Sequence, residues 1–210
     1  MENYKFSNNW FEVTAQKVWD QIIPKINPSR ILEIGSFEGA SLCYLINSLA
    51  RTHPLEVHCI DTWEGGVEHK ADGLAQANMD DVHLRFVHNT SLAIRAAPHR
   101  VSLTVHRGRS DLQLATLLAE GKADYFDFVY VDGSHEAPDV LLDAILGFKL
   151  LKVGGFIAFD DYLWAENLPG GKDLLRCPKP AIDAFTNIYF RKLVILSTHL
   201  YQLYAKKTSN

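Results

Sequence analysis

Carboxylates follow two apolar runs in the second half of the sequence. Asp132 comes directly after "FDFVYV", and the adjacent pair Asp160 and Asp161 comes directly after "GGFIAF". Three acids that converge in a partly dry site repel one another unless a cation or protons compensate their charge. Because oxygen ligands suit a hard divalent ion, we expect these three residues to bind Mg²⁺, with Mn²⁺ or Ca²⁺ as alternatives.

A histidine, His135, stands three residues after the first of these acids. The unperturbed pKa of an imidazole suits a general base near neutral pH, and a divalent ion would lower the pKa of a substrate hydroxyl. Asp132 and His135 are therefore the candidate catalytic residues. In the alternative interpretation, His135 caps a helix that starts near Pro138 or belongs to a solvated loop.

A glycine-containing turn follows the first apolar run, in "EIGSFEGAS" from Glu33 to Ser41. Gly35 allows a tight turn or a positive φ, and Gly39 lets the next helix start close to a ligand. These glycines are four residues apart, which departs from the dinucleotide fingerprint G-x-G-x-x-G. Because the Glu33 carboxylate would repel a phosphate and attract an α-ammonium group, the turn favours a ligand with an amino-acid end over NAD.

Polar residues also follow the next two apolar runs. Asp61 lies 22 residues after Gly39, where a carboxylate can accept hydrogen bonds from both hydroxyls of a ribose. Trp63 and Ser110 could frame an adenine, by its face and by its amino edge. A helix cap or an ordinary turn explains each feature alone, but their order within one domain favours a nucleotide-type cofactor.

Apolar runs alternate with amphipathic segments, and this alternation positions the polar residues. We expect strands over residues 30–35, 56–61, 101–108, 126–133 and 155–161, and helices over 40–51, about 80–97, 110–121 and 138–151, with Ser110 as an N-cap. Such units form a parallel sheet with helices on both faces, and ligands bind outside the carboxyl ends of its strands. A helix from Pro180 to about Ile188 and an antiparallel hairpin, over 190–196 and 200–206, complete the predicted α/β fold.

Composition narrows the class of protein. The 210 residues contain no linker, so we expect a single domain. A net charge of -4 gives no electrostatic footprint for nucleic acid, and no apolar run approaches the ~18 residues of a membrane span. The three scattered cysteines and the absence of a secretion signal favour a reducing cytoplasm. We therefore expect a cytoplasmic protein whose partner is a small molecule, not nucleic acid or a membrane.

With these residues in this order, the sequence resembles the class I S-adenosylmethionine-dependent methyltransferases. "EIGSFEG" is similar to their first motif, Asp61 to their ribose-binding acid, and the last helix and hairpin to the end of their sheet. Within that superfamily the sequence most resembles the metal-dependent O-methyltransferases, of the catechol and caffeoyl-CoA type and of the antibiotic-sugar type. The resemblance implies a Rossmann-like, seven-stranded, mostly parallel sheet with an antiparallel C-terminal strand over residues 30–206, preceded by a helical extension over 1–28.

The resemblance also implies a role for each candidate residue. S-adenosylmethionine would be bound by Glu33, Gly35, Ser36, Gly39, Ser41, Asp61, Trp63, Gly108, Ser110 and Asp111. The metal would be bound by Asp132, Asp160 and Asp161, and catechol-type enzymes have Asn where this chain has Asp161. Asp161 still offers an oxygen ligand, as Asn would, and it adds negative charge to the site. His135, in the position of the family's basic residue, would accept the proton as a methyl group is transferred to a hydroxyl of a small acceptor.

Three other functions stay open at this stage. The acids could be structural, which gives a metal-independent methyltransferase acting on O or N. The chain could be a non-catalytic sensor that binds S-adenosylmethionine or a nucleotide and uses its long loops for a partner. An NAD-dependent oxidoreductase is the remaining alternative, and the glycine spacing disfavours it.

Two long polar loops and an N-terminal helix surround the predicted site. The loops over 63–79 and 162–178 are expected to act as lids or substrate walls, or else to form mobile surface. Trp63, Tyr162 and Trp164 are expected to line the acceptor pocket, and the alternative is ordinary packing of loop aromatics. A helix from Trp10 to Ile23, after an Asn9 cap, could pack on its own domain, on a second subunit of a homodimer, or over the pocket.

Overall fold

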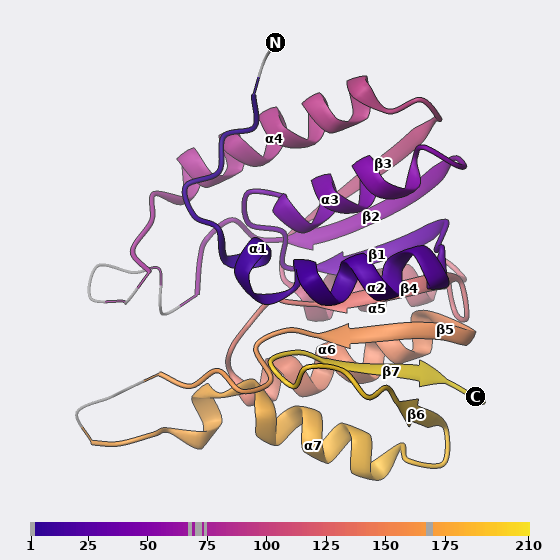
Figure 1. Ribbon diagram of the computed structural model, residues 1–210. Helices are drawn as coiled ribbons and strands as arrows, with labels where there is room; N and C mark the ends of the chain where they lie inside the picture. Colours follow the sequence, from indigo (N-terminus) through magenta and orange to yellow (C-terminus); the bar gives the residue numbers. More distant parts are fainter. Residues whose placement is uncertain (1–2, 67–68, 70–72, 74, 167–169) are drawn as a thin grey trace.

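The computed structural model describes residues 3–66, 69, 73, 75–166 and 170–210, and within them seven strands form one sheet (Figure 1). Its order is β3-β2-β1-β4-β5-β7-β6. The strands are β1 (Arg30–Ile34), β2 (Leu55–Asp61), β3 (Val101–Arg107), β4 (Phe126–Val131), β5 (Leu151–Phe159), β6 (Leu193–Ile195) and β7 (Leu203–Lys207). The first five pair in parallel, and β7 runs antiparallel to both β5 and β6. The predicted sheet is therefore confirmed.

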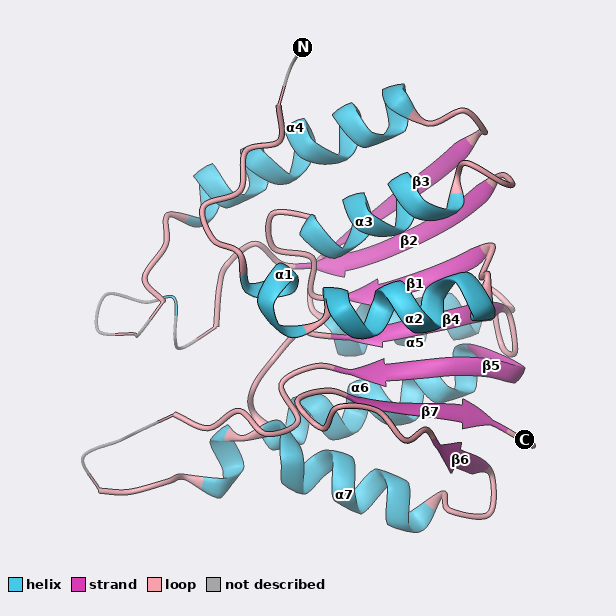
Figure 2. Ribbon diagram, viewed as in Figure 1, coloured by secondary structure: helices cyan, strands magenta, loops and turns pink. Residues whose placement is uncertain are grey.

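Helices cover both faces of this sheet (Figure 2). They are α1 (Trp10–Thr14), α2 (Gln16–Ile26), α3 (Ala40–Leu49), α4 (Met79–Ala96), α5 (Ser110–Ala119), α6 (Ala137–Leu150) and α7 (Pro178–Ile188), with a 3₁₀ helix, η2, over Leu174–Arg176. Residues of α2, α3 and α4 pack in one hydrophobic core and residues of α5, α6 and α7 in another. The sheet lies between these two layers.

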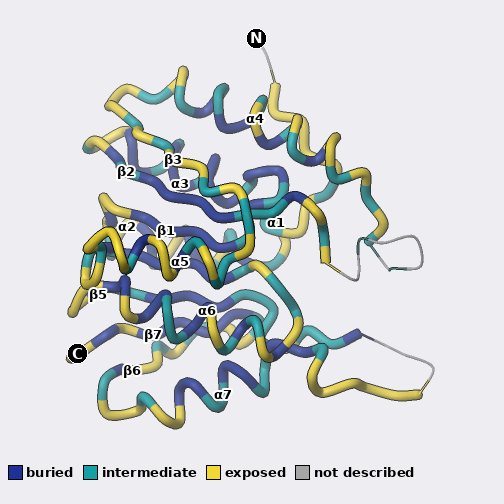
Figure 3. Tube along the Cα trace, turned by 180° about the vertical axis from the view of Figure 1, so that it is seen from behind, coloured by how far each residue is buried: buried dark blue, intermediate teal, exposed yellow. Residues whose placement is uncertain are grey.

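The alternation of side chains along the central strands explains why both faces are apolar. Phe128 and Tyr130 of β4 pack with Trp19 of α2, whereas Val129 and Val131 pack with the helices of the opposite layer. Successive residues of a strand point to opposite faces, so a strand buried on both sides is apolar throughout. Figure 3 shows the resulting burial of the central strands. Because the central strands are packed on both faces, their carboxyl ends are fixed next to one another along one edge of the sheet.

The N-terminal region differs from the prediction in two details. Instead of one helix, α1 and α2 are separate helices that meet at Ala15. Asn9 occupies the N-cap position of α1, but its side chain makes no capping hydrogen bond. The Asn8 carboxamide oxygen accepts a hydrogen bond from the Trp10 backbone N–H, at 3.1 Å. Both Asn8 and Asn9 precede this helix, and the direction in which the chain enters the helix decides which side chain can bond a free backbone N–H group of the first turn.

Other boundaries lie within a few residues of those predicted. Ser110 is the first residue of α5, and Arg109 holds the N-cap position without a side-chain bond. Helix α7 begins at Pro178 and not at Pro180. The middles of the two predicted loops, at residues 67–68, 70–72, 74 and 167–169, lie outside the described residues. Among the described helices, none combines the length and apolar character required to span a membrane.

Candidate active site

A cavity of about 690 Å³ lies at the carboxyl ends of the central strands. β1 pairs with β2 on one side and with β4 on the other, so the strand order reverses there. Such a reversal leaves a crevice outside the sheet, which is where open α/β sheets bind ligands. Residues that follow each of β1 to β5 line this cavity. The predicted gathering of polar residues at five strand ends is therefore present.

The turn after β1 is built on a glycine that no other residue could replace. Gly35 has a φ of 84°, and a Cβ placed on it would lie 2.0 Å from the backbone carbonyl oxygen of Asp132. The end of β1 therefore lies directly against the end of β4. Gly39 also has a positive φ, 78°, and forms the N-cap of α3. Gly35 has the positive φ that the sequence predicted, whereas Gly39 does not line the cavity, and a Cβ placed on it would lie 3.1 Å from the side chains of Phe86 and Thr90.

Glu33 lies behind the cavity wall and not in it. Its side chain is completely buried, and its carboxylate accepts hydrogen bonds from the hydroxyl groups of Ser36, at 2.5 Å, and Ser41. Burial raises the pKa of this carboxyl to about 7, against the opposing effect of the two hydroxyl groups. Ser36 and Ser41 line the cavity, whereas Glu33 is not among the lining residues. Glu33 therefore acts on the cavity through the two serines.

Asp61 ties the ends of β1 and β2 together. One carboxylate oxygen accepts hydrogen bonds from the backbone N–H groups of Ser36 and Phe37, both at 2.9 Å, and the other accepts from the Trp63 N–H at 2.7 Å. Asp61 also lines the cavity, and a carboxylate has capacity for more than three hydrogen bonds. It can hold the turn and still accept a bond from a ligand.

Trp63 points into the protein and not into the cavity. Its indole N–H donates a hydrogen bond to the Phe37 carbonyl oxygen, at 3.0 Å, and its ring packs against Phe86. Only 2% of its surface is exposed, and it is not a lining residue. The φ of Trp63 is 51°, so the chain turns at this residue and directs the ring inward. The structure places it in neither the adenine wall nor the acceptor wall.

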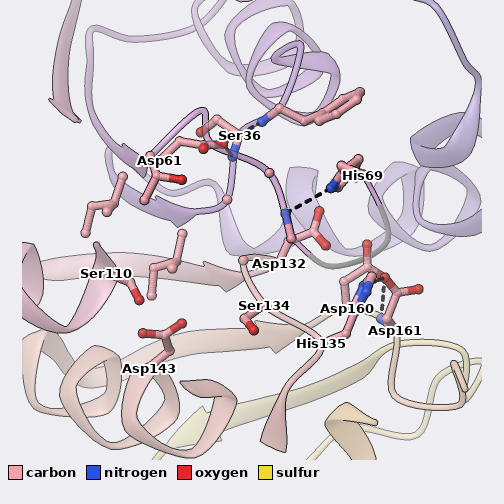
Figure 4. A pocket seen from close by; sticks show the side chains of 18 of the residues that line it. Ser36, Asp61, His69, Ser110, Asp132, Ser134, His135, Asp143, Asp160 and Asp161 are labelled. Atoms are coloured by element: carbon pink, nitrogen blue, oxygen red, sulfur yellow. Dashed lines mark hydrogen bonds and ion pairs between the residues drawn. The ribbon is translucent and has the colours of Figure 1, made fainter. Parts of the chain in front are cut away.

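The end of β3 forms one extremity of the cavity. Gly108, Ser110 and Asp111 all line it, as the sequence predicted. Asp111 is also paired with the exposed Arg109 guanidinium, at 2.9 Å. Asp143, on α6, borders the cavity at this extremity but was not predicted (Figure 4). The only feature of the sequence that could have indicated Asp143 is an acidic residue on the apolar side of an amphipathic helix.

The three predicted metal ligands come together at the opposite extremity. Asp132, Asp160 and Asp161 each offer a carboxylate oxygen, and these oxygens all lie within 4.8 Å of one another. Asp160 is held by the Tyr130 hydroxyl group and by the Gln202 side-chain N–H, the latter at 2.8 Å. Neither Tyr130 nor Gln202 was predicted.

Burial, and then repulsion between the carboxylates, raise the pKa values in this acid cluster. Burial, followed by the charges of Asp160 and Asp161, raises the pKa of Asp132 well above its ordinary value. Burial and the neighbouring Asp161 raise the pKa of Asp160 to about 6. Carboxylates this close ionise together only when a cation compensates them. Three convergent oxygen donors with raised pKa values fit a hard divalent cation such as Mg²⁺.

His135 lies against the same cluster. Its Nε2 is 2.9 Å from an oxygen of Asp161, and its ring stacks on Trp164 with the ring centroids 4.0 Å apart (Figure 4). The N-cap position of α6 belongs to Glu136, so His135 does not cap that helix. The ring is therefore fixed on one face by an aromatic side chain and at one nitrogen by a carboxylate.

The walls around His135 combine predicted and unpredicted residues. Trp164 lines the cavity as expected, but Tyr162 does not, because its hydroxyl group donates a hydrogen bond to Asp183 at 2.7 Å. The N-terminal region packs on its own domain and also reaches the cavity. Lining residues that the sequence analysis missed include Phe6, Phe37, His69 and Tyr201.

Comparison with known proteins relates this chain to methyltransferases. Residues 32–162 match a family model described as a methyltransferase domain. A caffeoyl-CoA O-methyltransferase of Populus kitakamiensis is 28% identical over 143 residues, which are 68% of this chain and 51% of the relative. A probable caffeoyl-CoA O-methyltransferase 3 of Dictyostelium discoideum is 32% identical over 166 residues, 77% of this chain and 56% of the relative. The chain thus spans about half the length of the curated relatives it matches.

A solved structure shares the fold over the whole chain. The O-methyltransferase TomG of Streptomyces achromogenes, solved in complex with SAM, superposes with a TM-score of 0.63. The alignment covers 100% of this chain and 84% of TomG, with 19% sequence identity. At that identity the likeness concerns the fold alone, so the described residues share the Rossmann-like architecture of TomG.

Proposed function

The chain belongs to the methyltransferase domain family, and from this premise we propose that it is an S-adenosylmethionine-dependent O-methyltransferase assisted by a divalent cation. The observation that carries the proposal is one continuous cavity. It is lined by the polar end of β3, by Asp61 and the turn after β1, and by the acid cluster with His135, and Figure 4 shows Ser110 and Asp160 on opposite sides of it. A methyl donor and an acceptor can therefore lie in contact.

The chain's own residues would bind the cofactor along the cavity. Ser36 and Ser41 donate their hydroxyl hydrogens to Glu33, so their oxygens remain as acceptors for an ammonium group of the methionine end. Asp61 would accept hydrogen bonds from the ribose hydroxyls. The adenine would lie beside Ser110 and Asp111. S-adenosylmethionine would supply the methyl group from its sulfonium centre.

The acid cluster would bind Mg²⁺ or another divalent ion through Asp132, Asp160 and Asp161. The ion would supply charge compensation and lower the pKa of an acceptor hydroxyl. His135 would accept the proton of that hydroxyl, and its bond to Asp161 fixes the orientation of the imidazole. Tyr130 and Gln202 hold Asp160 in place. Since methyl transfer is an in-line displacement, the main task of these residues is alignment of the oxygen with the methyl group.

A metal-independent methyltransferase is the second candidate function. The raised pKa of Asp160, about 6, supports it, because protons can compensate clustered carboxylates in place of a cation. In that case His135 and Asp161 would form the proton-accepting pair alone. Mg²⁺ would then change neither stability nor activity.

The remaining expectations extend the same proposal. The acceptor is a small hydroxylated molecule, since the walls near His135 are aromatic side chains such as Trp164 and Tyr201. Residues 30–206 form the single catalytic domain, and residues 1–28 are a helical extension that contributes to the cavity. A cytoplasmic location and assembly as a homodimer belong to the proposal as well, with neither nucleic acid nor a membrane as a partner.

Ligand-dependent thermal unfolding tests the proposal directly. We expect S-adenosylhomocysteine to raise the melting temperature by several degrees at saturating concentration and NAD to leave it unchanged. Addition of Mg²⁺ should produce a separate shift. A shift with NAD but not with S-adenosylhomocysteine would replace the proposed function by that of an oxidoreductase.

A further inference from the structure

Two buried side chains at the start of β7 form a hydrogen-bonded series that ends on Asp160. Strand β7 lies beside β5, and Asp160 directly follows β5 (Figure 1). The Tyr204 hydroxyl group donates to the Gln202 side-chain oxygen, and the Gln202 side-chain N–H donates to Oδ1 of Asp160, at 2.8 Å. Gln202 is 1% exposed, Tyr204 is fully buried, and neither lines the cavity. Both residues therefore act on the cavity through Asp160.

The direction of donation in this series follows from the chemistry of its members. An amide has a donor end and an acceptor end, and the Asp160 carboxylate accepts from the donor end. The acceptor end of Gln202 then bonds the Tyr204 hydroxyl group, which has a proton to donate. If the amide turned over, its oxygen would face a carboxylate oxygen, and the two acceptors would repel each other. Tyr204 thus helps to keep the Gln202 N–H directed at Asp160, and hydrogen bonds in such a series polarise one another.

Two further donors complete the hold on Asp160. Its Oδ1 also accepts from the Asp161 backbone N–H, at 2.8 Å, and its Oδ2 accepts from the Tyr130 hydroxyl group. The backbone at Asp161 is left-handed, with a φ of 52°, so the chain turns tightly there. A carboxylate has about four acceptor sites, so three donors leave capacity on Oδ2 for a cation. The Asp160 carboxylate is therefore fixed in orientation while it can still bind a metal.

A ligand that cannot rotate suits a cation with strict geometric demands. Mg²⁺ requires near-octahedral coordination at about 2.0–2.1 Å, whereas Ca²⁺ accepts irregular coordination at about 2.3–2.6 Å. We propose that Gln202 and Tyr204 are positioning residues that fix Asp160 in one orientation and thereby favour Mg²⁺ over Ca²⁺. The inference rests on the proposed function, because it takes the acid cluster to bind a divalent cation.

Calorimetric titration with Mg²⁺ and with Ca²⁺ tests this inference. Tyr204→Phe removes only the hydroxyl group that bonds the Gln202 amide, and Gln202→Met removes the donor but keeps an unbranched side chain. We expect each variant to bind Mg²⁺ about 10–100-fold more weakly than wild type, the usual effect of losing a residue that orients a metal ligand. The affinity for Ca²⁺ should change much less, because Ca²⁺ tolerates a displaced carboxylate. The preference for Mg²⁺ relative to Ca²⁺ should therefore fall.

Tyr125→Phe is the matched control. The Tyr125 hydroxyl group also donates to a carboxylate, that of Glu56, at 2.8 Å. Tyr125 precedes the start of β4, at the opposite end of that strand from Asp132, and it does not line the cavity. Its replacement should leave both cation affinities unchanged.

A purely structural role for Gln202 and Tyr204 predicts a different result. The variants would then have lower melting temperatures in a chelator, and Mg²⁺ and Ca²⁺ would bind with unchanged affinities or would weaken by the same factor. Either outcome overturns the inference while leaving the proposed function intact. If one of the two variants does not fold, the other provides the test. If wild type binds S-adenosylhomocysteine but neither cation, the cation part of the proposed function fails together with this inference.

Discussion

Nε2 of His135 lies 2.9 Å from Oδ2 of Asp161. The predicted proton acceptor is thus bonded to one of the predicted metal ligands. A carboxylate has two oxygens, so Asp161 can orient the imidazole with one and face the acid cluster with the other. In the proposed mechanism, this arrangement would bring proton removal and charge compensation to the same acceptor hydroxyl.

Replacement of the histidine should affect the chemical step and spare binding. We expect His135→Gln to lower kcat by about 10²–10⁴-fold, because the general base is lost. The affinity for S-adenosylhomocysteine should stay within about twofold of wild type, since Figure 4 shows His135 on the opposite side of the cavity from Ser110, beside which the adenine is proposed to lie. Steady-state kinetics and calorimetry measure the two quantities. Equal losses of binding and of kcat would point to a structural role.

The acid cluster should bind Mg²⁺ more tightly as the pH rises. Burial and Asp161 raise the pKa of Asp160 to about 6, and a metal requires ionised carboxylates. Saturating Mg²⁺ should therefore raise the melting temperature more at pH 8 than at pH 5.5, and Asp160→Asn should remove most of the shift. The isosteric amide keeps the Tyr130 and Gln202 neighbours in place. An identical shift in wild type and variant would locate the ion elsewhere.

Glu33 should make the metal-free protein less stable as the pH rises. The folded-state pKa of about 7 exceeds the ordinary value of 4.5, so the folded state binds the proton more tightly than the unfolded state. The contribution of Glu33 to stability is therefore fully present below about pH 4.5 and is lost as the pH rises through about 7, by about 3 kcal/mol in total. Glu33→Gln should reduce this slope in urea titrations. A slope as steep as that of wild type would mean that Glu33 is ionised throughout.

Two glycines with the same backbone conformation should respond differently to alanine. Gly35 and Gly121 have φ values of 84° and 82°, so each substitution carries the left-handed strain of about 1–2 kcal/mol. At Gly121 the added Cβ meets nothing within 4 Å, whereas at Gly35 it lies 2.0 Å from the Asp132 carbonyl oxygen. Gly35→Ala should therefore be the more destabilising by several kcal/mol, and should abolish ligand binding. Similar urea midpoints would show that the β1 and β4 ends can separate.

Much of the site follows from the sequence because parallel strands end at one edge of a sheet. Asp61, Asp132 and Asp160 could be assigned to that edge without coordinates, since each closes an apolar run. The direction of a side chain beyond the strand end could not be assigned in this way. The φ of 51° at Trp63 turns its ring into the core, and Ser36, in the turn after β1, points back so that its hydroxyl group donates a hydrogen bond to Glu33 within the strand.

Long-range partners were also beyond prediction. Gln202 reaches Asp160 only because Leu203 of β7 pairs with Phe159 of β5, and no sequence pattern sets that register. Gln202 and Asp160 are 42 positions apart in the sequence. Asp143 was missed for a related reason, since its neighbour Ser110 comes from a different β-α unit. Sequence periodicity predicts elements, whereas contacts between elements depend on the packing of the whole sheet.

Methyl transfer from labelled S-adenosylmethionine tests the proposed activity and its dependence on a divalent cation together. The assay compares wild type with Asp160→Asn against a panel of phenols, catechols and glycosides, with Mg²⁺ and with a chelator. We expect wild type to label at least one hydroxylated acceptor with Mg²⁺, and expect the label to fall by at least about 100-fold with the chelator or in the variant. Transfer that is equal in all four conditions would contradict the metal-assisted mechanism. No transfer to any acceptor, together with no binding of S-adenosylhomocysteine, would contradict the account as a whole.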